Sequence, residues 1–175
     1  MPWFPAARWS TTLRVATLLG IVVLIAAGIG AAMAIPRGTR VPFAEAFGIV
    51  VALVPPALVV GAALCVVRGF EVDRGELRVR RLLWTTAVPL TGLVRVAADS
   101  RLLAGSLRVF GNGGLFSFSG RFRNREVGPY RAFVTDWTRA VVLFVPGRAI
   151  VVSPADPAAF VRAVAARFPD AAVNA

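Results

Sequence analysis

Arginine is the residue type with the most chemistry to offer in this chain. Every second residue from position 121 to 125 is an arginine, so three guanidinium groups fall on one face of an expected strand. Positions 78 and 80 repeat the alternation earlier in the chain. A solvated strand face is one interpretation, and contact with anionic headgroups or an acidic partner is the other. The candidate lipid or partner contacts are Arg78, Arg80, Arg121, Arg123 and Arg125.

Catalytic and metal-binding chemistry has few candidates. All 20 basic residues are arginine, histidine and lysine are absent, and Cys65 is the single cysteine, inside an apolar run. Those absences exclude Ser-His-Asp and Cys-His nucleophile systems, histidine or thiolate zinc sites, P-loops and Schiff bases. Asp99, Glu126 and Asp136 are scattered, and turn chemistry explains Asp99 and Asp136. We therefore predict no catalytic residue, no cofactor and no metal.

A glycine-rich segment, 111–114, lies between two segments with strand periodicity. Consecutive backbone N–H groups in tight turns can bind a phosphate, and Gly111-Asn112-Gly113-Gly114 has the composition for it. Asn-Gly between two such segments is also the strongest short signal for a β-hairpin, and no helix follows to add its dipole. The sequence therefore favours a hairpin here over a phosphate site.

The composition indicates a protein that lies partly in lipid. Hydrophobic residues make up 57% of the 175 residues, yet the formal net charge is +11. From Arg68 onward there are 16 arginines and eight acidic residues, which places a basic domain after the most apolar part of the chain. Anionic lipid is the partner this favours. Nucleic acid is less favoured; arginines clustered along one groove with exposed aromatic residues would support it.

Two apolar segments are long enough to cross a bilayer as helices. No charged residue interrupts 15–35 or 46–67, and each segment can span about 30 Å of hydrocarbon. Pro55 and Pro56 lie inside the second segment, where a membrane helix tolerates them. Because the connection is short, the two spans should form an antiparallel transmembrane hairpin over 15–67. Small residues on both spans allow close packing within the chain or, alternatively, homodimerisation.

Flanking arginines predict the orientation of this hairpin. Arg8 and Arg14 precede the first span and five arginines follow the second within 14 residues, whereas the loop holds Arg37 and Arg40. The positive-inside rule then places both termini in the cytoplasm of a multi-pass protein of the plasma (inner) membrane. Ala32-Met33-Ala34 also resembles a signal-peptide cleavage site, but the apolar run is longer than a usual signal core.

The remainder of the chain has strand periodicity, followed by one helix. Residues 76–80 alternate, and the alternation then slips, which predicts a β-bulge near Arg80 and Arg81 because Leu82 and Trp84 restore it one residue late. At the end of the chain, Asp156 can cap a helix and Pro157 suits its first position. Its apolar stripe comprises Phe160, Val161, Val164 and Phe168.

This order of elements resembles the bacterial membrane-associated pleckstrin-homology-like (PH-like) family. The residues that carry the resemblance are Gly75 with Leu77, Val88-Pro89-Leu90, the segment 108–116 followed by Gly120, Val134-Thr135, and Ser153-Pro154-Ala155-Asp156-Pro157 with Phe160. The resemblance implies a two-helix transmembrane hairpin followed by a mainly-β domain: about seven antiparallel strands in a bent sheet pair, with one C-terminal α-helix. The predicted divisions are a cytoplasmic tail (1–14), the hairpin (15–67), the PH-like domain (69–168) and a C-terminal tail (169–175). Trp3, Phe4 and Trp9 in the first tail are expected at the inner membrane interface.

The function that follows is binding without catalysis. The family resemblance and the arginine pattern predict a membrane-anchored PH-like scaffold module at the cytoplasmic face, whose partners are the bilayer itself, anionic phospholipid headgroups, or a membrane protein or second copy of the chain. The alternative is a subunit of a membrane enzyme or transport complex with a site between hairpin and domain.

Overall fold

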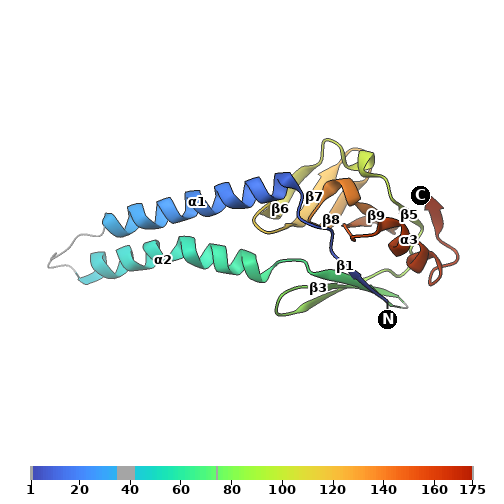
Figure 1. Cartoon of the computed structure of the whole chain (residues 1–175), viewed down its shortest axis with the longest axis horizontal. Helices are drawn as coiled ribbons and strands as arrows, with labels where there is room; N and C mark the ends of the chain where they lie inside the picture. Colours follow the sequence, from blue (N-terminus) through green and yellow to red (C-terminus); the bar gives the residue numbers. More distant parts are fainter. Residues whose placement is uncertain (1, 35–41, 74, 175) are drawn as a thin grey trace.

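Two long helices project from one side of a β-rich domain (Figure 1). The computed structural model describes residues 2–34, 42–73 and 75–174. Helix α1 spans Thr11–Met33 and α2 spans Pro42–Leu64; they run side by side in opposite directions. Both are long and apolar enough to cross a bilayer, and few of their side chains are buried. The predicted hairpin of two apolar helices therefore precedes the β domain.

The two helices differ from the predicted spans where they meet the domain. α1 begins at Thr11 because Ser10 caps it: the Ser10 side chain accepts a hydrogen bond from Leu13 N at 3.2 Å. α2 ends at Leu64, and Val67, the predicted end of the second span, is buried in the core of the β domain. Residues 35–41, which include the predicted end of the first span as well as Arg37 and Arg40, lie outside the described residues.

The β domain consists of two sheets, which hold eleven strands among the described residues. The smaller sheet has the order β1-β2-β3-β4, and the larger has the order β11-β5-β9-β10-β8-β7-β6. The strands of the smaller sheet are β1 Trp3–Pro5, β2 Gly69–Val72, β3 Glu76–Arg80 and β4 Thr85–Pro89. Those of the larger sheet are β5 Arg95–Ala97, β6 Leu107–Gly113, β7 Phe118–Asn124, β8 Gly128–Val134, β9 Val141–Val145, β10 Arg148–Val152 and β11 Ala172–Asn174.

The predicted fold class is confirmed, with a larger strand count than expected. A mainly-β domain with a C-terminal helix, α3 Pro157–Ala165, follows the hairpin. Most strand pairs are antiparallel, but β10 pairs with β8 in parallel, and so does β11 with β5. The β8–β10 exception arises because the chain passes from β8 through the short 3-10 helix Trp137–Arg139 to β9, and β10 then folds back between them.

Both predicted tails contribute a strand to the domain. β1 lies within residues 1–14 and pairs with β2, and β11 lies within residues 169–175 and pairs with β5. The Phe4 ring packs edge-on against Phe160 at 5.3 Å, and Trp9 lies against Phe116 at 5.9 Å. Both side chains are half-buried against the domain, and their expected place at the membrane interface stays a prediction.

The main core lies between the smaller sheet, part of the larger sheet and α3. Phe70, Leu77 and Ile150 are fully buried in it, together with Phe160 and Val164 of α3. Asp156 caps α3 by accepting a hydrogen bond from Ala159 N at 2.9 Å, as predicted. A second cluster covers the opposite face of the larger sheet. The long strands β6, β7 and β8 extend the larger sheet away from this core.

The predicted β-bulge near Arg80 and Arg81 is wrong. β3 ends at Arg80, and the chain turns, with Arg81 N donating to Trp84 O at 2.9 Å before β4 begins. The slipped alternation therefore reflects a turn whose apolar side chains are exposed, not a continued strand. The irregularity in pairing occurs instead in β6, between Arg108 and Phe110.

Candidate functional site

A groove runs along the larger sheet, from the end of α2 toward the turn between β9 and β10. Its volume is about 1110 Å³. One end is formed by Cys65, which follows α2, and by Arg81 in the turn between β3 and β4; Gly147 lies at the other end. The groove contains five arginines, and we call it the arginine groove. They are Arg81, Arg121, Arg123, Arg131 and Arg148.

Strand alternation and register bring these arginines together. On β7, Arg121 and Arg123 are exposed while Phe122 points to the other face and stacks on Tyr130 at 5.6 Å. Arg131 of β8 lies directly opposite Arg121, so two guanidinium side chains occupy neighbouring positions on one face. The next strand, β10, places Ile150 beside Arg131, where the main core ends and the groove begins.

Close packing of the sheet shapes the wall formed by β6 and β7. Gly111 and Gly120 lie opposite each other, and a Cβ atom at Gly120 would collide with the Phe110 carbonyl oxygen. Beside them, Val109 and Phe110 of the edge strand β6 line the groove with side chains that are 67% and 76% exposed. The groove therefore combines a basic floor with an apolar wall.

The groove concentrates positive charge without a compensating acid. None of its lining residues is a carboxylate, and the ion pairs found among the described residues involve Arg78 and Arg80, not the groove. Partial burial lowers the pKa of Arg131, and the like charges of Arg121 and Arg148 lower it further. Like charges on directly opposed strand positions are unfavourable. An anion bound among them would remove that repulsion.

Arg81 connects the groove to the end of α2. Its Nη1 donates to the carbonyl oxygen of Cys65 at 2.8 Å and its Nε donates to Thr86 Oγ1 at 3.2 Å. The guanidinium also lies over the buried Phe133 ring at 5.4 Å, and that of Arg131 lies over the same ring at 4.9 Å. Burial lowers the pKa of Arg81, and the charge of Arg131 adds to this effect. Two hydrogen bonds and the contact with Phe133 thus fix the Arg81 side chain, which still lines the groove.

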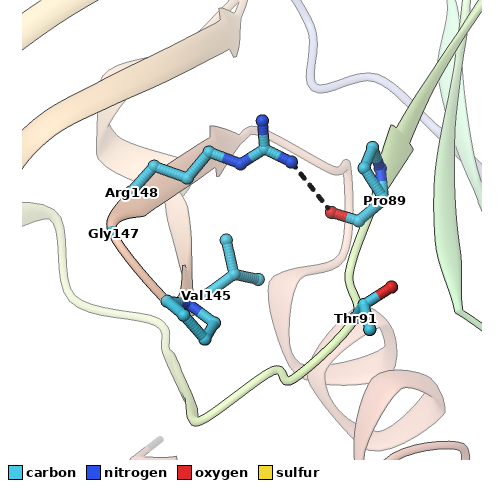
Figure 2. A pocket seen from close by; sticks show the side chains of 6 residues that line it. Pro89, Thr91, Val145, Gly147 and Arg148 are labelled. Atoms are coloured by element: carbon cyan, nitrogen blue, oxygen red, sulfur yellow. Dashed lines mark hydrogen bonds between the residues drawn. The ribbon is translucent and has the colours of Figure 1, made fainter.

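Arg148 links the two sheets at the far end. Figure 2 shows its side chain reaching from the start of β10 toward β4, where Nη2 donates to the Pro89 carbonyl oxygen at 3.5 Å. A second cavity of about 420 Å³ lies here and is lined by Pro89, Thr91, Val145 and the β9–β10 turn. This cavity holds one arginine, whereas the arginine groove holds five.

The structure separates the arginines proposed from sequence into two groups. Arg121 and Arg123 line the groove, whereas Arg125 is exposed outside it, in the turn between β7 and β8. Arg78 pairs with Glu76 at 2.6 Å, and Arg80 pairs with Glu71 at 2.9 Å, both on the smaller sheet.

Sequence reasoning missed Arg81, Arg131 and Arg148. Their alternation signals are weak because each lies in a turn or beside buried residues, and the strand register brings them together.

The glycine-rich segment does not form a phosphate site. Asn112 Oδ1 accepts hydrogen bonds from Gly114 N at 3.2 Å and Leu115 N at 2.9 Å, so the N–H groups that could bind a phosphate already have a partner. Gly111 to Gly113 complete β6, and the turn to β7 follows them. The hairpin interpretation therefore holds.

Helix α1 is anchored in the same wall. Thr17 is 4% exposed; its hydroxyl donates to Gly114 O at 2.9 Å and accepts from Phe116 N at 3.0 Å. Leu13, one turn earlier, is fully buried. The turn between β6 and β7 therefore holds α1 on one side of the groove, while Arg81 holds the end of α2 on the other.

These residues can bind anions but offer little for catalysis. Guanidinium groups donate paired hydrogen bonds to phosphate or carboxylate and remain charged at any physiological pH. The groove lining contains no carboxylate or imidazole that could act as a general base. Among the described residues, no group of three acidic, cysteine or histidine side chains could hold a metal.

Comparison with known families agrees with this fold. Residues 68–168 match the model of a family described as a bacterial PH domain, over more than half of the chain. No curated protein and no solved structure matches the chain. PH-like domains are typically binding modules without catalysis. The matched segment begins shortly after α2 and ends just beyond α3, so it contains all five arginines of the groove. On this match the chain belongs to the bacterial PH domain family.

Proposed function

We propose that this chain is a membrane-anchored PH-like module that works by binding, without catalysis, and that its arginine groove holds the phosphate-bearing headgroup of an anionic phospholipid. The observation that carries the proposal is the groove itself: five arginines and no acidic residue line it, and it opens beside the end of α2. If α2 crosses the bilayer, that end lies at the headgroup level.

The position of the chain ends supports a cytoplasmic domain on a multi-pass hairpin. β1 and β11 both belong to the β domain, and Figure 1 shows both ends of the chain there, on the same side of the helices. Combined with the positive-inside rule, this supports both termini in the cytoplasm of the inner membrane. Cleavage after Ala34 would remove β1 and the Thr17 contacts, which supports retention of the first helix.

The experiment compares groove and non-groove arginines in the full chain. The protein is reconstituted in nanodiscs of phosphatidylcholine, with or without phosphatidylglycerol, and its thermal unfolding is followed across a salt series. Anionic lipid should raise the unfolding temperature of the unaltered chain, and salt should reduce the increase. Arg121→Gln and Arg131→Gln should each remove about 1.5–3 kcal/mol of that stabilisation, the range for hydrogen bonds to charged groups.

Arg125→Gln is the matched control, because it removes the same charge from the same arginine-rich segment outside the groove. It should leave the effect of phosphatidylglycerol almost unchanged. Equal losses in all three variants would mean that lipid responds to net charge and would contradict the proposal. If phosphatidylglycerol has no effect on the unfolding temperature, the proposal is also contradicted, and a protein partner is favoured instead.

Nucleic acid is the second candidate that an observation favours, because the arginines do cluster along one groove and Phe110 is exposed beside them. The opening beside α2 favours lipid instead. A short oligonucleotide added to the zwitterionic nanodiscs discriminates the two: stabilisation by the oligonucleotide, lost in Arg131→Gln, would support nucleic acid. An enzyme subunit with a site between hairpin and domain gains no support, since the groove there lacks a carboxylate.

A further inference from the structure

The turn between β3 and β4 exposes three consecutive apolar side chains. Leu82, Leu83 and Trp84 are 47%, 71% and 43% exposed, and we call these residues the apolar tip. A hydrogen bond from Arg81 N to Trp84 O at 2.9 Å closes the turn behind them. A run of exposed apolar residues at a hairpin turn is unfavourable in water and marks a contact surface.

The apolar tip lies beside the end of α2. Arg81 immediately precedes it and donates to the Cys65 carbonyl oxygen at 2.8 Å, one residue beyond the end of that helix. Arg68 N, on the segment that leaves α2, donates to Arg80 O at 2.9 Å. In Figure 1 the hairpin that contains β3 reaches back toward α2. These contacts fix the tip at the level where α2 enters the domain.

The corresponding turn of the larger sheet is covered by protein. The turn between β6 and β7 packs on α1: Thr17 bonds to Gly114 and Phe116, and Trp9 lies against the Phe116 ring. Among the described residues, no helix covers the apolar tip in the same way, and its three side chains remain exposed. These side chains are therefore open to whatever surrounds the end of α2.

The chemistry of the tip matches the interface of a bilayer. Tryptophan favours the headgroup level, leucine the adjacent hydrocarbon, and flanking arginines contact phosphates. Arg80 is exposed on one side of the tip, and the Arg81 guanidinium lies 5.9 Å from the Trp84 ring centroid. Continuity with α2 favours lipid over a protein partner, because the same lipid that surrounds the end of α2 reaches the tip.

We propose that Leu82, Leu83 and Trp84 insert into the headgroup–hydrocarbon boundary of the bilayer as a third membrane contact beside the two helices. This inference rests on the proposed membrane attachment but not on lipid binding in the arginine groove. With α1, α2 and the tip all in contact with lipid, the β domain is held in one orientation at the membrane, and the groove opens at a fixed height.

The test measures the depth of three fluorescent labels. In a Cys65→Ser background, single cysteines are introduced as Leu83→Cys in the tip, Val22→Cys on the exposed face of α1, and Ala158→Cys on the exposed face of α3. Each full-length variant is labelled with an environment-sensitive nitrobenzoxadiazole dye and placed in nanodiscs. Lipids with a nitroxide either near the headgroup or deep in the acyl chain then quench the dye.

We expect the label at 83 to be quenched several-fold more by the shallow nitroxide than the label at 158, and the label at 22 to be quenched by the deep one. Quenching at 22 with none at 83 would overturn the inference and leave membrane attachment intact. A blue-shifted but unquenched label at 83 would indicate protein cover and overturn it as well. No quenching at 22 would overturn the membrane attachment and this inference with it.

Discussion

At the level of single residues, the arginines of the groove repel one another, and an aromatic ring partly stabilises them. Arg121 and Arg131 lie opposite each other, and Arg148 adds a third positive charge. Like charges directly opposite each other on neighbouring strands are destabilising. The Phe133 ring partly offsets this cost, since two guanidinium groups lie over it. The ring therefore helps to hold Arg81 and Arg131 in place, which would lower the cost of ordering these two side chains if an anion binds.

One polar residue decides how α1 is held, and Thr17→Val tests it. The substitution keeps the shape but leaves Gly114 O and Phe116 N without the bonds that the hydroxyl supplies. We expect a loss of about 1–3 kcal/mol in the free energy of unfolding, the cost of unsatisfied buried groups. The measurement is thermal or denaturant unfolding of the reconstituted chain.

Thr12→Val is the control for this change, because Thr12 lies on the same helix and is exposed. It should alter stability by less than about 0.5 kcal/mol, as surface substitutions usually do. Similar losses in both variants would show that the contact between α1 and the β6–β7 turn contributes nothing specific.

At the scale of elements, β1 makes the N-terminal segment part of the domain. It forms an edge of the smaller sheet, and Phe4 packs on Phe160 of α3. Phe4→Ala should cost on the order of 2 kcal/mol, less than the roughly 3–5 kcal/mol of a fully buried phenylalanine, since Phe4 is partly buried.

Unfolding of the full chain measures this effect, and Phe4→Leu supplies the matched comparison. Leucine retains much of the apolar burial, so it should recover more than half of the loss. If Phe4→Ala unfolds at the same temperature as the unaltered chain, the packing of β1 does not contribute to the stability of the domain.

Sequence periodicity predicted the longer elements better than the short ones. The alternation at 76–80 predicted β3, and the cap at Asp156 predicted α3, because each pattern lies within a single segment of the chain. β1 and β11 have three residues each, too few for a period, and they form because partner strands lie beside them. The slip after Arg80 indicated a local change but could not distinguish a bulge from a turn.

The groove could be predicted only in part for a similar reason. The arginines at 121 and 123 stand out because they alternate along one strand, as do those at 78 and 80. Arg78 and Arg80 form ion pairs with Glu76 and Glu71. Glu76 lies two residues before Arg78 on the same strand face, whereas the Arg80–Glu71 pair depends on the pairing of β2 with β3. The opposition of Arg121 and Arg131 depends on the β7–β8 register, which a single sequence does not specify.

In the molecule as a whole, short connections join both helices to the β domain. α1 starts from a segment that forms β1 and then contacts the β6–β7 turn, and α2 passes into β2 within five residues. Neither connection contains a long linker, so the domain has little freedom to turn relative to the helices. If the helices cross a bilayer, the groove meets its surface at one angle and one distance, as the proposed headgroup site requires.

Native mass spectrometry of the full chain tests whether the arginine groove holds an anionic phospholipid headgroup. The protein is extracted from native membranes in a mild detergent, and the mass of the protein with its bound lipids is measured. We predict one retained anionic phospholipid on the unaltered chain and on Arg125→Gln, and its loss from Arg121→Gln and Arg131→Gln. Lipid retention that does not depend on headgroup charge, or that persists in Arg121→Gln and Arg131→Gln, would show that the groove is not the headgroup site.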